Sequence, residues 1–63
     1  MSPVKQAINE RKKEIAKKIN NFSYFTETEK KNLIEWINSI DTVISLESSI
    51  SEIEKKMSDF EQK

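Results

Sequence analysis

The sequence predicts an all-α fold, an antiparallel up-down-up three-helix bundle. Apolar residues recur at intervals of three and four along most of the 63-residue chain, which is the periodicity of amphipathic helices. The chain has no glycine and one proline, whereas β-hairpin turns usually need glycine or asparagine at positive φ. Polar breaks divide the pattern into three segments. We therefore expect helices at about 3–20, 27–40 and 43–61 in a single module covering residues 1–63.

The first helix is expected to start at Pro3, because proline suits the first helical position and Ser2 before it can cap the helix. One face of this helix carries apolar side chains, with the stem of Arg11 filling the gap between them. These apolar residues are Val4, Ile8, Ile15, Ile19 and Phe22. They give the helix one side to bury against its neighbours.

Local patterns also predict an ion pair on this helix and the position of its end. Glu14 lies four residues before Lys18, a spacing at which the two side chains can pair on a helix surface. Asn20 and Asn21 are expected to end the helix. Asparagine tolerates the left-handed backbone conformation that closes a helix when glycine is absent.

The second helix is expected to begin at a capping box, the sequence T-E-T-E at residues 26–29. In this motif Thr26 caps the helix and Glu29 reaches back to the backbone amide of Thr26. The apolar residues on one side of the helix are Leu33, Trp36, Ile37 and Ile40. Ile34 falls outside this face.

The third helix is expected to begin after Asp41 and Thr42, either of which can cap it. This corner contains neither glycine nor proline. The apolar residues that follow recur at alternating spacings of three and four, at Val43, Leu46, Ile50, Ile53, Met57 and Phe60. Three amphipathic helices with short connections must bury these stripes against one another, which favours the bundle.

The composition argues against enzymatic chemistry. Without histidine or cysteine the chain lacks the commonest general base, nucleophile and metal ligands. Without glycine it also lacks a phosphate-binding loop. The remaining carboxylates lie among lysines on the expected solvated faces. We therefore expect no enzyme, no metal site and no cofactor.

Charge and hydropathy limit the partners. The chain has 11 basic and 11 acidic residues, so we expect no nucleic acid partner, although the second helix could present Lys30 and Lys31 to phosphates. No apolar run approaches the roughly 18 residues of a membrane span, so we expect no membrane insertion. Leu33, Trp36 and Ile44 flank the corner at residues 41–42, and such apolar groups are candidates for a protein contact patch.

The segment from Ile19 to Ile50, I-N-N-F-S-Y-F-T-E-T-E-K-K-N-L-I-E-W-I-N-S-I-D-T-V-I-S-L-E-S-S-I, resembles the GA-type three-helix modules of Gram-positive surface proteins. These include albumin-binding modules related to protein G and repeats of staphylococcal matrix-binding adhesins. The corner I-N-S-I-D-T-V is similar to the pattern I-N-x-A-K-T-V of the albumin-binding modules. The resemblance implies a three-helix fold with a contact surface on the second helix, the corner and the start of the third helix.

The positions that match this contact surface are Leu33, Trp36, Thr42, Ile44, Glu47 and Ser48. Only Thr42 is identical to the residue usual in the albumin binders, so the resemblance does not select albumin among the ligands. It implies a non-enzymatic, monomeric module that binds a host serum or extracellular-matrix protein. It also implies an extracellular, cell-wall-associated location within a larger surface protein.

Two other functions stay open. The module could be a ligand-free structural spacer repeat of a surface adhesin. Alternatively, if the chain is a complete native protein, we expect a cytoplasmic location and a small intracellular interaction or regulatory protein. That protein could dimerise through the apolar stripe of the third helix.

Overall fold

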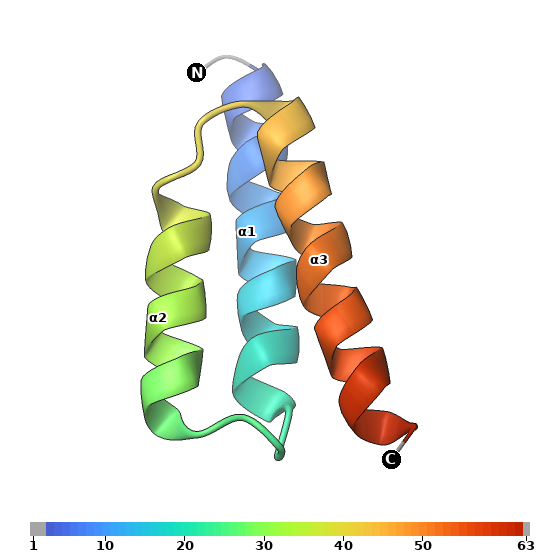
Figure 1. Cartoon of the computed structure of the whole chain (residues 1–63). Coiled ribbons are helices and arrows are strands. Elements are labelled where there is room, and N and C mark those ends of the chain that lie inside the picture. Colours follow the sequence, from blue (N-terminus) through green and yellow to red (C-terminus); the bar gives the residue numbers. More distant parts are fainter. Residues whose placement is uncertain (1–2, 63) are drawn as a thin grey trace.

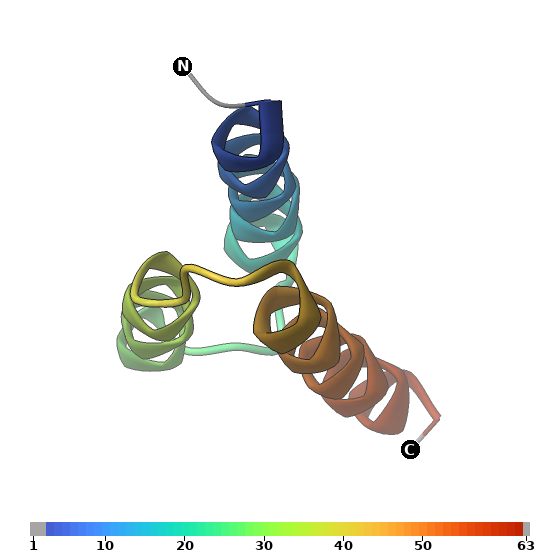
Figure 2. The same cartoon turned by 90° about the horizontal axis from the view of Figure 1, so that it is seen from above.

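The computed structural model describes residues 3–62, which form three helices and confirm the all-α bundle. These are α1 (Pro3–Asn21), α2 (Glu27–Asn38) and α3 (Val43–Glu61). Figure 1 shows α1 and α3 running in one direction and α2 running in the other. Seen along the bundle in Figure 2, the helices occupy the corners of a triangle. Ser2, the predicted cap of α1, lies outside the described residues.

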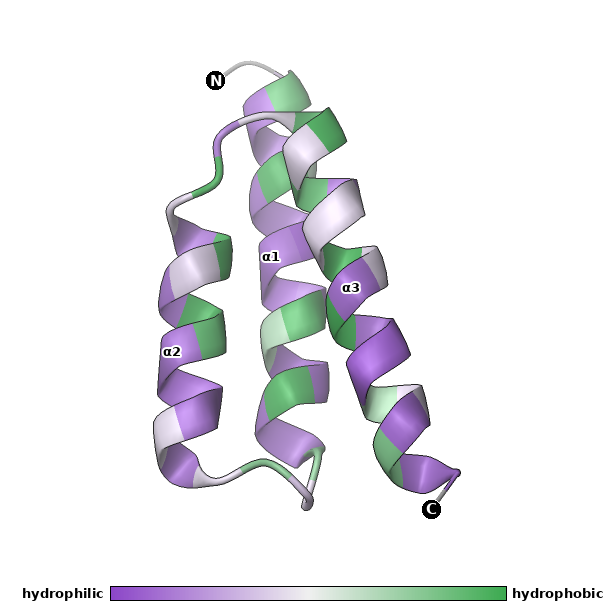
Figure 3. Cartoon of the chain, in the orientation of Figure 1, coloured by the Kyte–Doolittle hydropathy of each residue, from purple (hydrophilic) through white to green (hydrophobic). Residues whose placement is uncertain are grey.

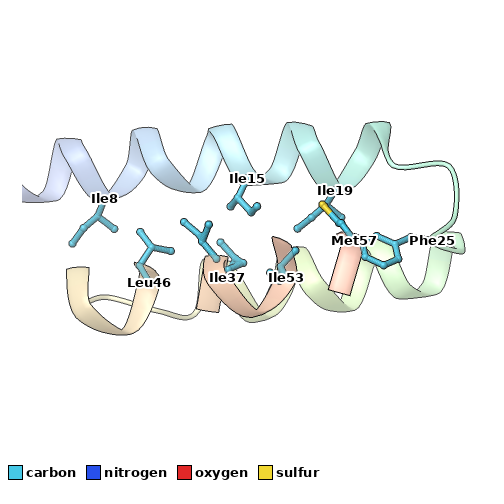
Figure 4. Close-up of a cluster of buried hydrophobic side chains, with 9 residues drawn as sticks. Ile8, Ile15, Ile19, Phe25, Ile37, Leu46, Ile53 and Met57 are labelled. Carbon is cyan, nitrogen blue, oxygen red and sulfur yellow. The ribbon is translucent and has the colours of Figure 1, made fainter. Parts of the chain in front are cut away.

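The core is one layer of buried apolar side chains between the three helices. Figure 4 shows Ile8 beside Leu46 at one end of this layer and Phe25 beside Met57 at the other. The core residues are Ile8, Ile15, Ile19, Phe25, Ile37, Leu46, Ile50, Ile53 and Met57. The predicted stripes of α1 and α3 are therefore confirmed in the middle of each helix.

The stripe of α3 is not available to a second copy of the chain in this structure. Leu46, Ile50 and Ile53 are almost completely buried, and Met57 joins the same core. Dimerisation through these residues would require the bundle to open and expose its own core. At the start of each stripe the prediction is wrong, because Val4 and Val43 are exposed.

The second helix ends at Asn38 and not at Ile40 as predicted. The Ser39 hydroxyl donates to the carbonyl oxygen of Trp36 at 2.7 Å, and the Ser39 amide donates to the same oxygen at 3.1 Å. A serine side chain that competes for a backbone carbonyl in this way favours helix termination. Ile40 still packs against the core from the connection, and so does Ile34, which the sequence pattern left outside the apolar face.

The end of α1 also differs from its prediction. No described residue has a positive φ, so Asn20 and Asn21 do not close the helix in a left-handed conformation. The helix continues through Asn21, and the amide of Phe22 then donates to the carbonyl oxygen of Ile19 at 3.2 Å. The chain therefore turns through a short hydrogen-bonded connection that needs no special backbone conformation.

Aromatic packing closes the bundle at this end. The ring of Phe22 lies 4.7 Å from that of Phe25, measured between centroids, and 6.1 Å from that of Phe60. Tyr24 stacks on Phe60 with a centroid distance of 6.0 Å and nearly parallel planes. Aromatic pairs in these geometries stabilise beyond the area they bury. Through Phe60, the last turn of α3 is fixed to the connection between α1 and α2.

The predicted capping box at the start of α2 is confirmed. The amide of Glu29 donates to the Thr26 hydroxyl at 3.1 Å, and the amide of Thr26 donates to the Glu29 carboxylate at 3.1 Å. Two amides that have no partner within the helix are satisfied in this way. The sequence pattern alone was sufficient here because both partners lie within four residues.

We expect Thr26→Ala to lower the free energy of unfolding by about 1 kcal/mol, because it removes the acceptor for the Glu29 amide. Thr28→Ala is the matched control, since Thr28 is exposed and lies within the first turn of the same helix. Urea denaturation of both variants measures the difference. An equal loss of unfolding free energy for Thr26→Ala and Thr28→Ala would contradict the capping role of Thr26.

Candidate protein-binding surface

A bidentate ion pair fixes α1 against α3. The Arg11 guanidinium donates from Nε to Glu47 Oε2 at 2.8 Å and from Nη2 to Glu47 Oε1 at 2.9 Å. It also donates from Nη1 to Glu14 Oε2 at 3.0 Å. Such paired geometry is specific as well as favourable. The ion pair therefore joins one turn of α1 to one turn of α3.

The pairing between Glu14 and Lys18 predicted from their spacing is wrong. Glu14 binds Arg11 instead, and the Lys18 ammonium lies 3.6 Å from the carboxylate of Glu54 on α3. A local rule for helix surfaces fails here because a second helix supplies competing partners. Both inter-helix ion pairs lie along the contact between α1 and α3.

The titration of both partners is coupled to this contact. Hydrogen bonds to Glu47 and then to Glu14 raise the pKa of Arg11 above its ordinary value. The hydrogen bond from Arg11 lowers the pKa of Glu47 below its ordinary value, against the opposing effect of desolvation. Each group is thus held in its charged form by the other.

Exposed apolar residues lie one helical turn before the Arg11–Glu47 ion pair, toward the starts of α1 and α3. Residues three or four positions before Arg11 and Glu47 lie one helical turn away, on the same sides of α1 and α3. The residues at these positions are Ala7 on α1 and Val43 and Ile44 on α3. Val4 lies one turn closer to the start of α1. We call these four residues the apolar edge. Figure 3 shows hydrophobic segments in the first turns of α1 and α3, at the same end of the molecule.

The residues of the apolar edge are unusually exposed for their type. Ile44 is 86% exposed, Val4 is 57% exposed and Val43 is 47% exposed. Single exposed apolar residues are common, whereas contiguous ones tend to mark a contact surface. Ile44 lies off the buried stripe of α3. The bundle therefore presents Ile44 to solvent in the first turn of α3.

Thr42 explains why α3 begins where it does. Its hydroxyl accepts from the Ser45 amide at 3.3 Å, and its carbonyl oxygen accepts from the Leu46 amide at 3.0 Å. Of the two predicted caps, Asp41 and Thr42, the threonine performs the role. Its side chain is committed to the start of the helix, which places Ile44 in the first turn.

The six residues predicted from the sequence do not lie on one side of the bundle. Glu47 lies on the side of α3 that faces α1, as the bond from Arg11 shows, whereas the 86% exposed Ile44 lies on the outer face of α3, opposite the buried stripe. On α2 the side facing α1 is marked by Asn38, whose carbonyl oxygen accepts from the Lys12 ammonium at 3.1 Å. Trp36 lies on the opposite flank of α2, facing α3.

The other predicted residues follow the same division. Leu33 lies on the same flank of α2 as Trp36 and packs against the core, whereas Trp36 is 41% exposed. Ser48 is exposed on the outer face of α3, one turn after Ile44, and Thr42 lies at the corner between α2 and α3. The structure thus places Ile44 and Ser48 on the outer face of α3, Glu47 toward α1, and Leu33 and Trp36 on one flank of α2.

Sequence reasoning missed Val4, Ala7 and Val43 as surface residues, because their spacing continues the core stripes or adjoins them. The unequal lengths of the helices could have indicated that these residues are exposed. The second helix has 12 residues, whereas α1 and α3 have 19 each. A short middle helix cannot cover the first turns of its two longer neighbours, so apolar residues there stay exposed.

Between residues 3 and 62, no three acidic, histidine or cysteine side chains gather in a group that could hold a metal ion. Within that same range no helix has both the length and the apolar composition needed to cross a bilayer. No protein-family model, curated protein or solved structure matches the chain.

We expect Trp36 and its neighbour Ile37 to differ strongly in their effect on stability. Ile37→Ala removes a buried side chain and should cost about 2–5 kcal/mol. Trp36→Ala removes a side chain that lies half in solvent and should cost about 1 kcal/mol or less. Chemical denaturation measures both variants. A larger loss for Trp36→Ala would place the indole in the core.

We expect the contribution of Glu47 to stability to depend on pH. The fold lowers the pKa of Glu47 below its ordinary 4.5, so its ion pair stabilises the bundle above that value. This contribution is lost as the pH falls through the lower pKa of the folded state. Glu47→Gln should therefore be less stable than the parent chain at pH 7, and the difference should shrink toward pH 3.

Urea denaturation at both pH values measures this difference without changing the ionic strength. Glu52→Gln is the matched control, because it makes the same charge change on α3 at an exposed residue outside the ion pairs of the described chain. A difference between Glu47→Gln and the parent chain that is the same at pH 7 and pH 3 contradicts the ion-pair contribution.

Proposed function

We propose that this chain is a non-enzymatic protein-binding module and that the apolar edge at the start of α3 is its principal contact surface. The observation that carries the proposal is the 86% exposure of Ile44 beside the exposed Val4 and Val43. Burying a side chain of this type against a partner is worth about 1.5–3 kcal/mol. The Arg11–Glu47 pair lies one turn from the edge and joins its two helices, whose register is held mainly by the buried core. The edge is therefore a preformed surface.

The class of partner comes from the family resemblance. The likeness of Ile19–Ile50 to GA-type modules supports a host serum or extracellular-matrix protein as the ligand, bound by a module of a Gram-positive surface protein outside the cell. In that arrangement the start of α3 contributes Ile44, and the half-exposed Trp36, on another side of the bundle, is the alternative anchor. Tryptophan is enriched in binding hot spots.

The size of the module limits the affinity of a single copy. The bundle measures 42 × 19 × 15 Å along its principal axes, so one side of it provides a small interface. Linking several copies in one surface protein raises the overall strength of attachment without new contacts. We therefore expect weak binding by the isolated module and stronger retention by tandem copies.

We expect Ile44→Ser to weaken binding about tenfold, because it removes the most exposed apolar group of the edge. Immobilised albumin and fibronectin, tested separately with the module at micromolar concentration, provide the measurement. Lys56→Ser is the matched control, since it places the same residue at an exposed position near the other end of α3. Neither variant should change the melting temperature strongly.

Two outcomes would contradict the proposal. If neither protein, nor any component of whole serum, retains the parent module or its tandem copies, the module is a spacer without a ligand. If Trp36→Ala abolishes retention while Ile44→Ser does not, the contact surface lies on the side of α2 that faces α3, and the apolar edge is not the principal site.

A further inference from the structure

Positive charge on α1 is neutralised on one flank only. The helix carries six basic and two acidic residues, whereas α3 carries five acidic and two basic residues. On the flank facing α3, Arg11 and Lys18 pair with glutamates of α3. Within the described residues no ion pair joins α1 to α2. The lysines on the α2 flank therefore have no ion-pair partner on α2.

Two adjoining hollows follow this flank. The larger, of about 260 Å³, lies between α1 and α2. The smaller, of about 190 Å³, continues along α1 past the end of α2. Both are lined by Asn9 and Lys12, which makes them parts of one depression. We call this depression the lysine groove, and the lining residues that define it are Lys5, Ile8, Lys12, Lys13, Ala16 and Ile34.

The short second helix explains why the groove exists. Because α2 ends at Asn38, the first turns of α1 have no helix beside them on this flank (Figure 1). The Lys12 ammonium donates to the Asn38 carbonyl oxygen at 3.1 Å, so this lysine closes the end of α2. Lys5 and Lys13 are exposed and form no ion pair among the described residues.

The groove combines an apolar floor with cationic rims. The half-buried Ala16 and Ile34 supply most of the apolar surface above the buried Ile8, while Lys5 and Lys13 stand on the rim. From residue 5 to residue 16 a helix rises about 16 Å, which is the length of roughly three helical turns. A ligand that fills the groove must therefore be elongated and apolar on one side, with negative charge at its edges.

We propose that the lysine groove binds an acidic amphipathic helix of a partner protein. The apolar stripe of such a helix fits the floor, and its flanking carboxylates meet the ammonium groups of Lys5 and Lys13. A nucleic acid backbone fits less well, because it has no apolar stripe for the floor. The groove lies on the opposite flank of α1 from the apolar edge, so this proposal is independent of the proposed function.

The test uses the whole chain and a 14-residue synthetic peptide with blocked ends. Its leucines recur at helical spacing, and glutamates flank the leucine stripe. We expect saturable binding at low salt, with amide chemical shift changes centred on Asn9, Lys12, Ile34 and Asn38. The same peptide with lysine in place of every glutamate should not bind.

Charge-reversal variants locate the site. Lys5→Glu/Lys13→Glu should weaken peptide binding about tenfold, since it reverses both rim charges. Lys55→Glu/Lys56→Glu is the matched control, because it changes the net charge equally on exposed residues of α3. The control should weaken binding less than about twofold. Neither pair takes part in an ion pair of the described chain, so both variants should fold.

Four outcomes would overturn the proposal. The first is no saturable peptide binding up to millimolar concentration, and the second is an equal loss of peptide affinity for the two double variants. The third is chemical shift changes centred on Val43 and Ile44, and the fourth is the same shift changes and affinity with a single-stranded oligonucleotide. The third result would move the peptide to the apolar edge. The fourth would show a general anion surface. Whether Ile44→Ser loses binding to a serum protein is a separate result, and it does not affect the interpretation of the peptide experiments.

Discussion

Burial of the isoleucine stripe of α1 is the interaction on which the other contacts depend. Ile15 and Ile19 are almost completely inaccessible to solvent, and both α2 and α3 pack along the helix that carries them. A chain of 63 residues buries only about 60% of its unfolded surface, and this one has no cysteine for a disulfide. Its stability therefore rests on one layer of side chains, with α1 at the centre of the packing.

Because α1 packs against both α2 and α3, its two flanks contact different partners and differ in their ion pairing. Toward α3, the Arg11–Glu47 pair aligns two helices of equal length and leaves the apolar edge one turn above it. Toward α2, the partner is seven residues shorter than α1 and supplies no acidic partner for the lysines. The same inequality of length leaves Val4 and Val43 exposed and opens the lysine groove on the α2 flank.

Sequence reasoning succeeded where the determining contacts are local. The helical periodicity and the Thr26–Glu29 capping box involve neighbours within a few residues, so the helices and the start of α2 could be predicted. It failed where distant groups compete. Glu14 and Lys18 have favourable spacing, but residues of other turns and of α3 take both as partners. The exposure of Val43 could not be predicted either, because it depends on how far α2 extends beside it.

The exposure of Ile44 has a different origin from that of Val4 and Val43. The two valines continue the core stripes, so a longer α2 would bury more of them. Local hydrogen bonds of Ser39 and Thr42 prevent this by ending α2 and starting α3 at set positions. Ile44 lies off the stripe, on the side of α3 that faces away from α2, so no extension of α2 could cover it. Folding of this chain alone therefore leaves Ile44 86% exposed, whatever the length of α2.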